Sequence, residues 1–273
     1  MKLTCLEKTN LKDFTDNNYA QGSFFWNYLI KNKEIKVNGK RVDRNIELND
    51  GDEIVYFLNK KQQEKEAFFV VYEDENVLVI DKESGVNSEA VFADLARRRE
   101  CYFVHRLDRN TRGLLVFALN KTSENELLLA FKERLPQKVY YALCFGDFLK
   151  KRDVLTAYLK KDAQKSTVKV YSEPKVGTEK IVTEYEVLEK MGARTKVKVW
   201  LHTGKTHQIR AHLAFIGCPI VGDMKYGLQD KNKEYSTSRQ QLISKSLTFK
   251  GLSALEYLND KEFISRFDFD CDN

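Results

Sequence analysis

The alternation of apolar and polar residues predicts several strands joined by short turns. Residues 68–82, FFVVYEDENVLVIDK, are typical of two strands around an acidic turn. Residues 181–190 and 194–202 alternate on either side of a turn, which indicates an antiparallel hairpin. The apolar run 113–120, GLLVFALN, is typical of a buried strand, and 138–146, KVYYALCFG, of a strand closed by glycine.

Helical spacing of apolar residues predicts helices over 88–99, 123–135 and 206–217. Ser123 and Glu126 have the spacing of a capping box at the start of the second of these helices. Its expected buried face consists of Leu128, Phe131 and Leu135.

The first 60 residues show a different pattern, with a short helix predicted over 24–32 and a hairpin over 35–42. Asn38-Gly39 favours the tight turn of that hairpin, and a turn and strand follow at 50–57. The polar, charged run 61–67 is interpreted as a linker.

Strands joined both by hairpins and by helices indicate an α+β fold with a largely antiparallel, mixed sheet. The predicted organisation is a small N-terminal α+β module over residues 1–60, a linker over 61–67 and a larger domain over 68–273.

Composition excludes several classes of protein. Hydrophobic residues make up 42% of the 273 residues, which is ample for a folded core. No apolar run approaches the roughly 20 residues of a membrane helix, and the N-terminus lacks a signal-peptide pattern, so a cytoplasmic protein without a membrane partner is expected. The five cysteines form no Cys-x-x-Cys pair, so neither a disulfide framework nor a thiolate zinc site is expected.

Positive charge gathers in two stretches of the chain, although the net charge is only +6. Residues 97–112 carry six arginines against two acidic residues, and residues 196–212 carry four lysines or arginines and no acid. Two such stretches could form a phosphate-binding surface, or they could be a solvated charged face. The tail from Phe267 to Asn273 is acidic.

The segment 105–113, HRLDRNTRG, concentrates polar side chains before the predicted buried strand. Nearby positive charge favours an ionised Asp108, and a partly desolvated carboxylate is suited to nucleophilic attack. A structural salt bridge is the alternative interpretation. The side chains that could supply the positive charge are His105, Arg106, Arg109 and Arg112.

Three of the four histidines lie in 201–223, LHTGKTHQIRAHLAFIGCPIVGD. His207 and His212 are five residues apart, which would place them on opposing faces of a helix and argues against a shared metal ion. Arg210 lies one turn after His207, on the same face. The N-terminus of this helix could bind a phosphate; an amphipathic helix without a ligand is the alternative.

Tyr140 and Tyr141 should point to opposite faces of their strand. One is expected in the core, and the other at a cleft, where a tyrosine can stack on a base or move a proton, or simply at the surface.

Four segments together resemble the RluA-type pseudouridine synthases in order and spacing: VYEDENVLVIDKESGV (71–86), HRLDRNTRGLLVFA (105–118), KVYYALCFG (138–146) and GKTHQIRAHLAFIGCPIVGDMKYG (204–227). The segment 35–55 resembles the RNA-binding module named after ribosomal protein S-four, although the region before it is poor in lysine and arginine.

The resemblance implies a pseudouridine synthase fold with a central catalytic cleft, and isomerisation of uridine in RNA after the base is flipped out. It implies Asp108 as nucleophile, Tyr140 beneath the target base, and Arg210 paired with Asp108. Arg106 would enter the RNA stack, without any metal or other cofactor. The further residues expected to contact RNA are His105, Arg109, Thr111, Arg112, Lys205, Thr206, His207 and Gln208.

Ribosomal RNA is the favoured partner, with tRNA as the alternative, and a monomer is expected. A non-catalytic RNA-binding or ribosome-assembly protein is the second hypothesis. It is motivated by departures from the family pattern: Arg112 in place of Ser, Leu119 in place of Lys, no Pro after Lys82, and Ser88 in place of His.

Overall fold

The computed structural model describes residues 1–162, 166–237 and 239–269. The chain forms two compact units. Unit 1 comprises Met1–Arg109 and Leu115–Glu124, and unit 2 comprises residues 110–114 and those from 125 onward. Within the described residues, no helix is long and apolar enough to cross a membrane.

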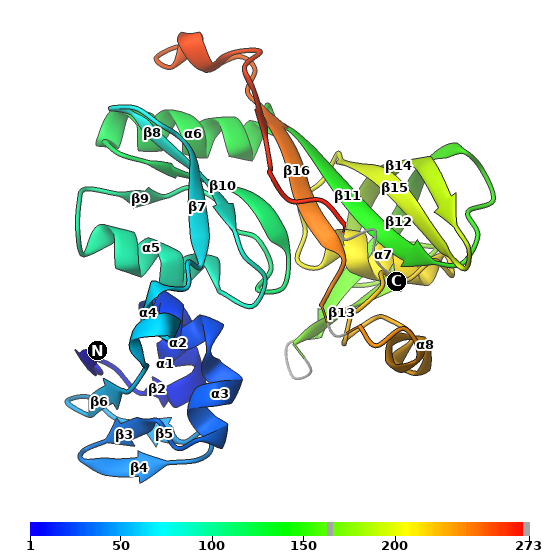
Figure 1. Ribbon diagram of the computed structural model, residues 1–273. Helices are drawn as coiled ribbons and strands as arrows, with labels where there is room; N and C mark the ends of the chain where they lie inside the picture. The colour runs from blue at the N-terminus through cyan, green and yellow to red at the C-terminus, as the bar shows by residue number, and fades with distance from the viewer. Residues whose placement is uncertain (163–165, 238, 270–273) are drawn as a thin grey trace. The chain divides into compact units, whose positions relative to one another are not determined.

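Unit 1 begins with a small α+β module (Figure 1). Its elements are β1 (Lys2–Thr4), β2 (Thr9–Asn10), α1 (Leu11–Asn18), α2 (Ala20–Phe24), α3 (Trp26–Lys31), β3 (Ile35–Val37), β4 (Lys40–Val42), β5 (Glu47–Leu48) and β6 (Glu53–Tyr56). Four strands form a sheet in the order β1-β6-β3-β4. A hydrophobic cluster drawn from residues 3–58 fills the space between this sheet and the helices. We call residues 1–58 the N-terminal module.

The predicted hairpin over 35–42 is confirmed, because β3 and β4 pair antiparallel. Asn38 and Gly39 both have positive φ, as a type I′ turn requires. The short helix predicted over 24–32 is confirmed as α3, and a further short helix that was not predicted, α2, precedes it and is separated from it by Phe25.

The remainder of unit 1 begins with α4 (Lys60–Glu64), which lies in the predicted linker. It is followed by β7 (Phe68–Glu73), β8 (Val77–Lys82), α5 (Ser88–Ala96) and β9 (Tyr102–Phe103), and by the second part of β10 (Arg112–Ala118). β7 and β8 pair antiparallel as predicted, and β10 is buried along its whole length. The helices α1 and α2 of the N-terminal module pack against α5 (Figure 1). The two compact units thus divide at other positions than the predicted linker, and the boundary at 61–67 stays a prediction.

The helix α6 (Lys121–Glu133) starts earlier than the sequence pattern indicates. Asn120 caps it, because its Oδ1 accepts a hydrogen bond from the Ser123 N–H at 2.9 Å. The predicted capping box at Ser123 is therefore wrong. The predicted apolar face is wrong as well, since Leu128 is 41% exposed, whereas Leu127 is fully buried.

Unit 2 is built on a mostly antiparallel sheet in the order β13-β12-β14-β15-β11-β16, with β17 paired to β16. Its strands are β11 (Gln137–Phe145), β12 (Arg152–Asp162), β13 (Thr167–Tyr171), β14 (Glu179–Met191), β15 (Arg194–Leu201), β16 (Leu242–Thr248) and β17 (Glu262–Ile264). The other elements are α7 (Gln208–Phe215), α8 (Gln229–Glu234) and the 3-10 helix η1 (Glu256–Leu258). The predicted α+β class with a largely antiparallel sheet is confirmed.

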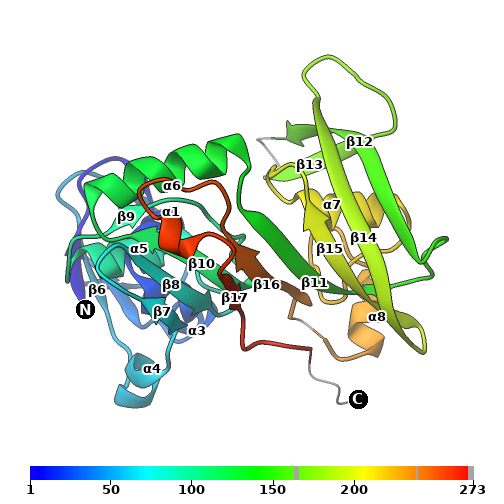
Figure 2. The same cartoon turned by 90° about the horizontal axis from the view of Figure 1, so that it is seen from above.

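The hairpin predicted around residues 191–193 is confirmed by the pairing of β14 with β15. The helix α7 packs against β13 and β14 (Figure 2). The first residues of β10 join this sheet, because Gly113 pairs in parallel with Ser244 of β16. A Cβ on Gly113 would lie 2.3 Å from the Ser244 carbonyl oxygen, so this close approach requires glycine.

Candidate active site

Asp108 lies on the loop between β9 and β10 and is half-buried. Ser88, at the start of α5, fixes the backbone just before it. The Ser88 hydroxyl accepts from the Leu107 N–H at 3.0 Å and donates to the Leu107 carbonyl at 3.1 Å. Since Ser88 is fully buried, these hydrogen bonds are shielded from water and hold the loop firmly.

Lys82, the last residue of β8, fixes the backbone just after Asp108. Its Nζ donates to the carbonyl oxygens of Glu83 and Val86, each at 2.9 Å, and of Arg109 at 3.1 Å. Complete burial lowers the pKa of Lys82 to about 7, although the negative charge of Asp108 opposes this shift. The loop is therefore held on both sides of Asp108 by buried side chains.

Arg109 follows Asp108 and connects the loop to the N-terminal module. Its Nη1 donates to both carboxylate oxygens of Asp16, at 3.1 and 3.0 Å. Its Nη2 donates to the Ser23 carbonyl at 2.6 Å, and its Nε to the Gly85 carbonyl at 3.0 Å. The guanidinium thus links three segments that are far apart in sequence.

His105 and Arg106 lie on the same loop, three and two residues before Asp108. His105 accepts the Val116 N–H on its Nε2 at 3.1 Å, which joins the loop to β10. The Arg106 side chain is 66% exposed, and its guanidinium forms an ion pair with Glu89 at 2.7 Å. Its exposure leaves it accessible to a large substrate.

Thr111 and Arg112 belong to unit 2 and are almost fully buried. The Thr111 hydroxyl accepts from Gln240 Nε2 at 3.0 Å. Arg112 holds the C-terminal segment: its Nη2 donates to the Asp268 carbonyl at 3.3 Å, and its guanidinium lies 5.2 Å from the centre of the Phe267 ring. The predicted RNA contacts of Thr111 and Arg112 stay predictions.

We expect Arg112→Ser, which introduces the usual family residue, to loosen the C-terminal segment. The variant loses a cation–π contact and a hydrogen bond from a charged donor, so about 1–2 kcal/mol of local stability should disappear. Trypsin should then cleave after Arg266 about ten times faster than in the wild type, as followed by mass spectrometry. Lys198→Ser is the control, because Lys198 makes its cation–π contact with Trp200 of β15 rather than with the C-terminal segment. Equal cleavage rates in Arg112→Ser and the wild type would contradict this role.

The two adjacent tyrosines of β11 do point to opposite faces, as predicted. Tyr140 is 7% exposed and pairs with Val199 and Ser244 on its neighbouring strands. The Tyr141 ring instead lies near two lysines that also hold the C-terminal segment: Lys196 Nζ is 5.3 Å and Lys245 Nζ 5.9 Å from its centre. Of the two, Tyr140 is on the face that α7 covers.

Arg210, on α7, forms a buried two-point ion pair with Asp223. Its Nε donates to Oδ2 at 2.7 Å and its Nη2 to Oδ1 at 2.9 Å. Burial alone would raise the pKa of Asp223, but Arg210 and the N–H groups of Lys225 and Tyr226 hold that pKa below its usual value. Arg210 lies in unit 2 and Asp108 in unit 1, so their predicted pairing stays a prediction.

The predicted phosphate-binding turn before α7 is held mainly by Gln208. This amide is 2% exposed: it accepts from Thr203 and the Lys205 N–H, and donates to Val182 and Thr183. Lys205 forms an ion pair with Glu179, and Thr206 is exposed. The structure therefore places Gln208 inside the protein and Thr206 at its surface.

His207 is the N-cap of α7 and has a positive φ, so it lies just outside the helix that carries Arg210. Both contact Tyr226: its hydroxyl lies 2.9 Å from His207 Nδ1, and its ring centre lies 5.3 Å from the Arg210 guanidinium carbon. His212 points elsewhere, with Nδ1 at 3.0 Å from the Thr183 hydroxyl. The predicted placement of His207 within the helix is therefore wrong, although the two histidines do contact different residues.

His212 should destabilise the protein in mild acid. Burial lowers its pKa to about 4 from an ordinary value near 6.5, so between these values the unfolded chain binds more protons than the folded chain. Lowering the pH from 7 to 5 should therefore cost about 2 kcal/mol of folding free energy through this residue. Urea unfolding of wild type and His212→Gln at both pH values checks this. An equal pH dependence in the two proteins would contradict it.

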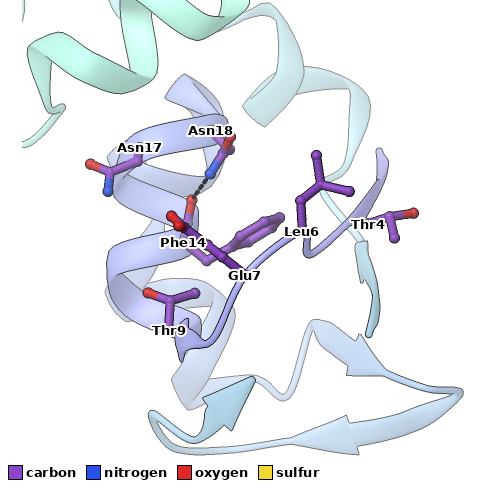
Figure 3. A pocket seen from close by; sticks show the side chains of 7 residues that line it. All are labelled: Thr4, Leu6, Glu7, Thr9, Phe14, Asn17 and Asn18. Atoms are coloured by element: carbon purple, nitrogen blue, oxygen red, sulfur yellow. Dashed lines mark hydrogen bonds between the residues drawn. The ribbon is translucent and has the colours of Figure 1, made fainter. Parts of the chain in front are cut away.

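A pocket of about 330 Å³ lies on the N-terminal module, between the β1–β2 segment and α1 (Figure 3). Its lining includes Leu6, Phe14 and the carboxylate Glu7, with neither lysine nor arginine among its described lining residues. A negative, partly apolar lining does not favour RNA phosphates. We therefore do not place the RNA site in this pocket.

Sequence reasoning did not assign site roles to Lys82, Ser88, Asp16 and Asp223. Lys82 and Ser88 drew notice only for departures from the family pattern: Ser88 stands in place of His, and Lys82 is not followed by Pro. A lysine that ends a buried strand is a signal that could have identified Lys82, since a buried amine requires several acceptors. The partner of Arg109 could not be found in this way, because Asp16 lies 93 residues earlier.

Comparisons with known proteins identify the family of this chain. The sequence model of the RNA pseudouridylate synthase family matches residues 76–215. The chain is 33% identical over 224 residues to ribosomal large subunit pseudouridine synthase C of Vibrio vulnificus (strain CMCP6), a match that covers 73% of this chain and 70% of the relative. It is 31% identical over 235 residues to the protein of the same name from Rickettsia felis (strain URRWXCal2), with 75% of each chain covered.

A solved structure shares the fold. Human RNA pseudouridylate synthase domain containing 1 superposes with a TM-score of 0.62 at 26% sequence identity, covering 73% of this chain and 83% of the human chain. Human RNA pseudouridylate synthase domain containing 4 has the same fold, with a TM-score of 0.59. These matches show that the chain belongs to the RNA pseudouridylate synthase family, in its RluA-type branch.

Proposed function

We propose that the protein converts specific uridines of ribosomal RNA to pseudouridine, with Asp108 as the nucleophile. The observation that carries this assignment is the placement of Asp108. Its half-buried carboxylate sits on a loop fixed on one side by Ser88 and on the other by Lys82. A nucleophile held in this way is oriented before the substrate arrives, which lowers the entropic cost of attack.

The reaction exchanges one bond of uridine for another. The bond between the ribose C1′ and the uracil N1 breaks, the base turns, and a bond forms between C1′ and C5. The C5 proton leaves and N1 takes up a proton, so that product and substrate are isomers. Asp108 supplies the nucleophilic carboxylate, and Arg210 pairs with it to keep it ionised. Tyr140 lies beneath the base and assists removal of the proton.

The target nucleotide must leave its stack before the base can turn, at a cost of a few kcal/mol. Arg106, exposed at the loop, would fill the space that the base vacates. Lys205, Thr206 and His207 would contact the RNA backbone near α7. Loops of ribosomal RNA, where bases are unstacked, are the expected targets, and the protein would act in the cytoplasm as a monomer.

The ribosomal target is supported by the names of relatives from Vibrio vulnificus and Rickettsia felis, which are large-subunit synthases. The resemblance of the N-terminal module to an RNA-binding module also supports it.

Tritium release from RNA that carries uridine tritiated at C5 tests this function. The substrates are ribosomal and transfer RNA fractions from cells that lack their own modifications. Release from the ribosomal fraction is expected. Release from transfer RNA alone would change the target class, and no release from either fraction, with RNA binding intact, would favour a non-catalytic RNA-binding protein.

A further inference from the structure

A charged contact connects the loop that carries Asp108 to the N-terminal module. Arg109 donates to both oxygens of the Asp16 carboxylate and to the carbonyl of Ser23. Asp16 lies on α1 and Ser23 on α2, whereas Arg109 directly follows Asp108. An ion pair therefore joins the module to the residue next to the proposed nucleophile.

Asp16 is itself held in place. It is 8% exposed, and the Ser23 hydroxyl donates to its Oδ1 at 2.8 Å. Lys12, one turn earlier on α1, forms an ion pair with its other oxygen. The Ser23 hydroxyl also lies 3.3 Å from the Asn87 N–H, just before α5. A two-point contact to such a fixed, shielded carboxylate is stronger than a surface ion pair.

Arg109 is fixed along its main chain as well as its side chain. Its carbonyl accepts from the Gly85 N–H at 2.9 Å and from Lys82 Nζ at 3.1 Å, and its Nε donates to the Gly85 carbonyl. Within the described residues, Asp16 is the carboxylate that pairs with this guanidinium. Removal of the Asp16 charge would leave a partly buried guanidinium without its counterion. This is unfavourable and would drive the guanidinium, and the loop with it, toward another arrangement.

We propose that Asp16 is a positioning residue for the reaction: through Arg109, the N-terminal module holds Asp108 in its attacking position. This inference rests on the proposed function of Asp108. The module then forms part of the support for the catalytic loop, whether or not it also binds RNA. Since a displacement of about 1 Å can cost about 100-fold in rate, a single contact of this kind can set kcat.

The test compares Asp16→Asn with Asp94→Asn in the full chain. Asp94, on α5, is a matched control because it also joins the N-terminal module to the remainder of unit 1: its Oδ2 accepts the Ala20 N–H at 2.8 Å, and it pairs with Arg97. Neither of these contacts involves the loop of Asp108.

We expect Asp16→Asn to lower kcat for tritium release about 10- to 100-fold and to change KM for RNA less than 3-fold. Asp94→Asn should stay within 2-fold of wild type in both constants. Arg109→Lys, which keeps the positive charge but loses the forked geometry, should lower kcat to a similar extent. The double variant Asp16→Asn/Arg109→Lys should be no slower than the slower single variant, because both changes break one contact.

A second measurement does not depend on activity. Hydrogen exchange of the backbone amides in residues 105–110 should become about 10-fold faster in Asp16→Asn, but not in Asp94→Asn. If the wild type released no tritium, the proposed function would fail, while exchange would still report the connection between Asp16 and the loop. Wild-type exchange and kcat in Asp16→Asn, or a change confined to KM, would overturn the inference.

Discussion

Replacement of Asp108 by Asn is expected to reduce pseudouridine formation by at least about 1000-fold. The side chain keeps its size but loses the charge that makes it a nucleophile. Because Ser88 and Lys82 hold the loop through its backbone rather than through the Asp108 side chain, the loop should keep its conformation. Tritium release measures the loss, and RNA binding by filter retention should stay within about 3-fold of wild type.

Glu75→Gln is a suitable control, since Glu75 is an acidic residue of the β7–β8 turn, away from this loop in sequence. It should retain wild-type activity. Substantial turnover by Asp108→Asn would contradict the assigned role and direct attention to another nucleophile. Loss of both activity and RNA binding would point instead to a structural role of the carboxylate.

Lys82→Met should remove a marked pH dependence of stability. With a pKa of about 7 in the folded protein and about 10.5 in the unfolded chain, Lys82 carries fewer protons when folded throughout this range. The contribution of this residue to the free energy of unfolding therefore increases, and the protein becomes more stable, as the pH rises. Between pH 7 and 9.5, wild type should gain about 3 kcal/mol relative to Lys82→Met. Urea unfolding at the two pH values measures the difference.

Lys60→Met provides the control, because it also removes one lysine but at a position where the side chain is 90% exposed. Its stability should follow the pH dependence of wild type. A constant difference between wild type and Lys82→Met across this pH range would show that the buried amine keeps its ordinary pKa.

Local sequence patterns predicted the hairpins of this fold well, because neighbouring strands of a hairpin are close in sequence. The pairing of β14 with β15 is an example. The parallel pairing of Arg112 with Ile243 was not predicted, since no local pattern specifies a partner so far along the chain. The error at α6 had a local cause: Asn120 and Ser123 are both good capping residues, and the earlier one caps the helix.

The candidate site shows the same division. The concentration of charge in 105–113 made Asp108 a candidate nucleophile, with a structural salt bridge as the alternative, and the resemblance implied its role. The contacts that hold the loop come from Lys82, Ser88 and Asp16, which are 19 to 93 residues distant from their partners. Such contacts are a property of the packed structure. Arg210 had a visible signal in its helical spacing, but its partner Asp223 lies beyond the helix.

The division of the chain between the two units has a consequence for the order of folding. Residues 110–114 belong to unit 2, although residues of unit 1 both precede and follow them. During synthesis all residues of unit 1 emerge before β16 does. The start of β10 can therefore pair with β16 only after about 130 further residues have been made. Pairings of such long range form slowly. We expect the final joining of β10 to β16 to be a late event in folding, after the sequence around Asp108 has left the ribosome.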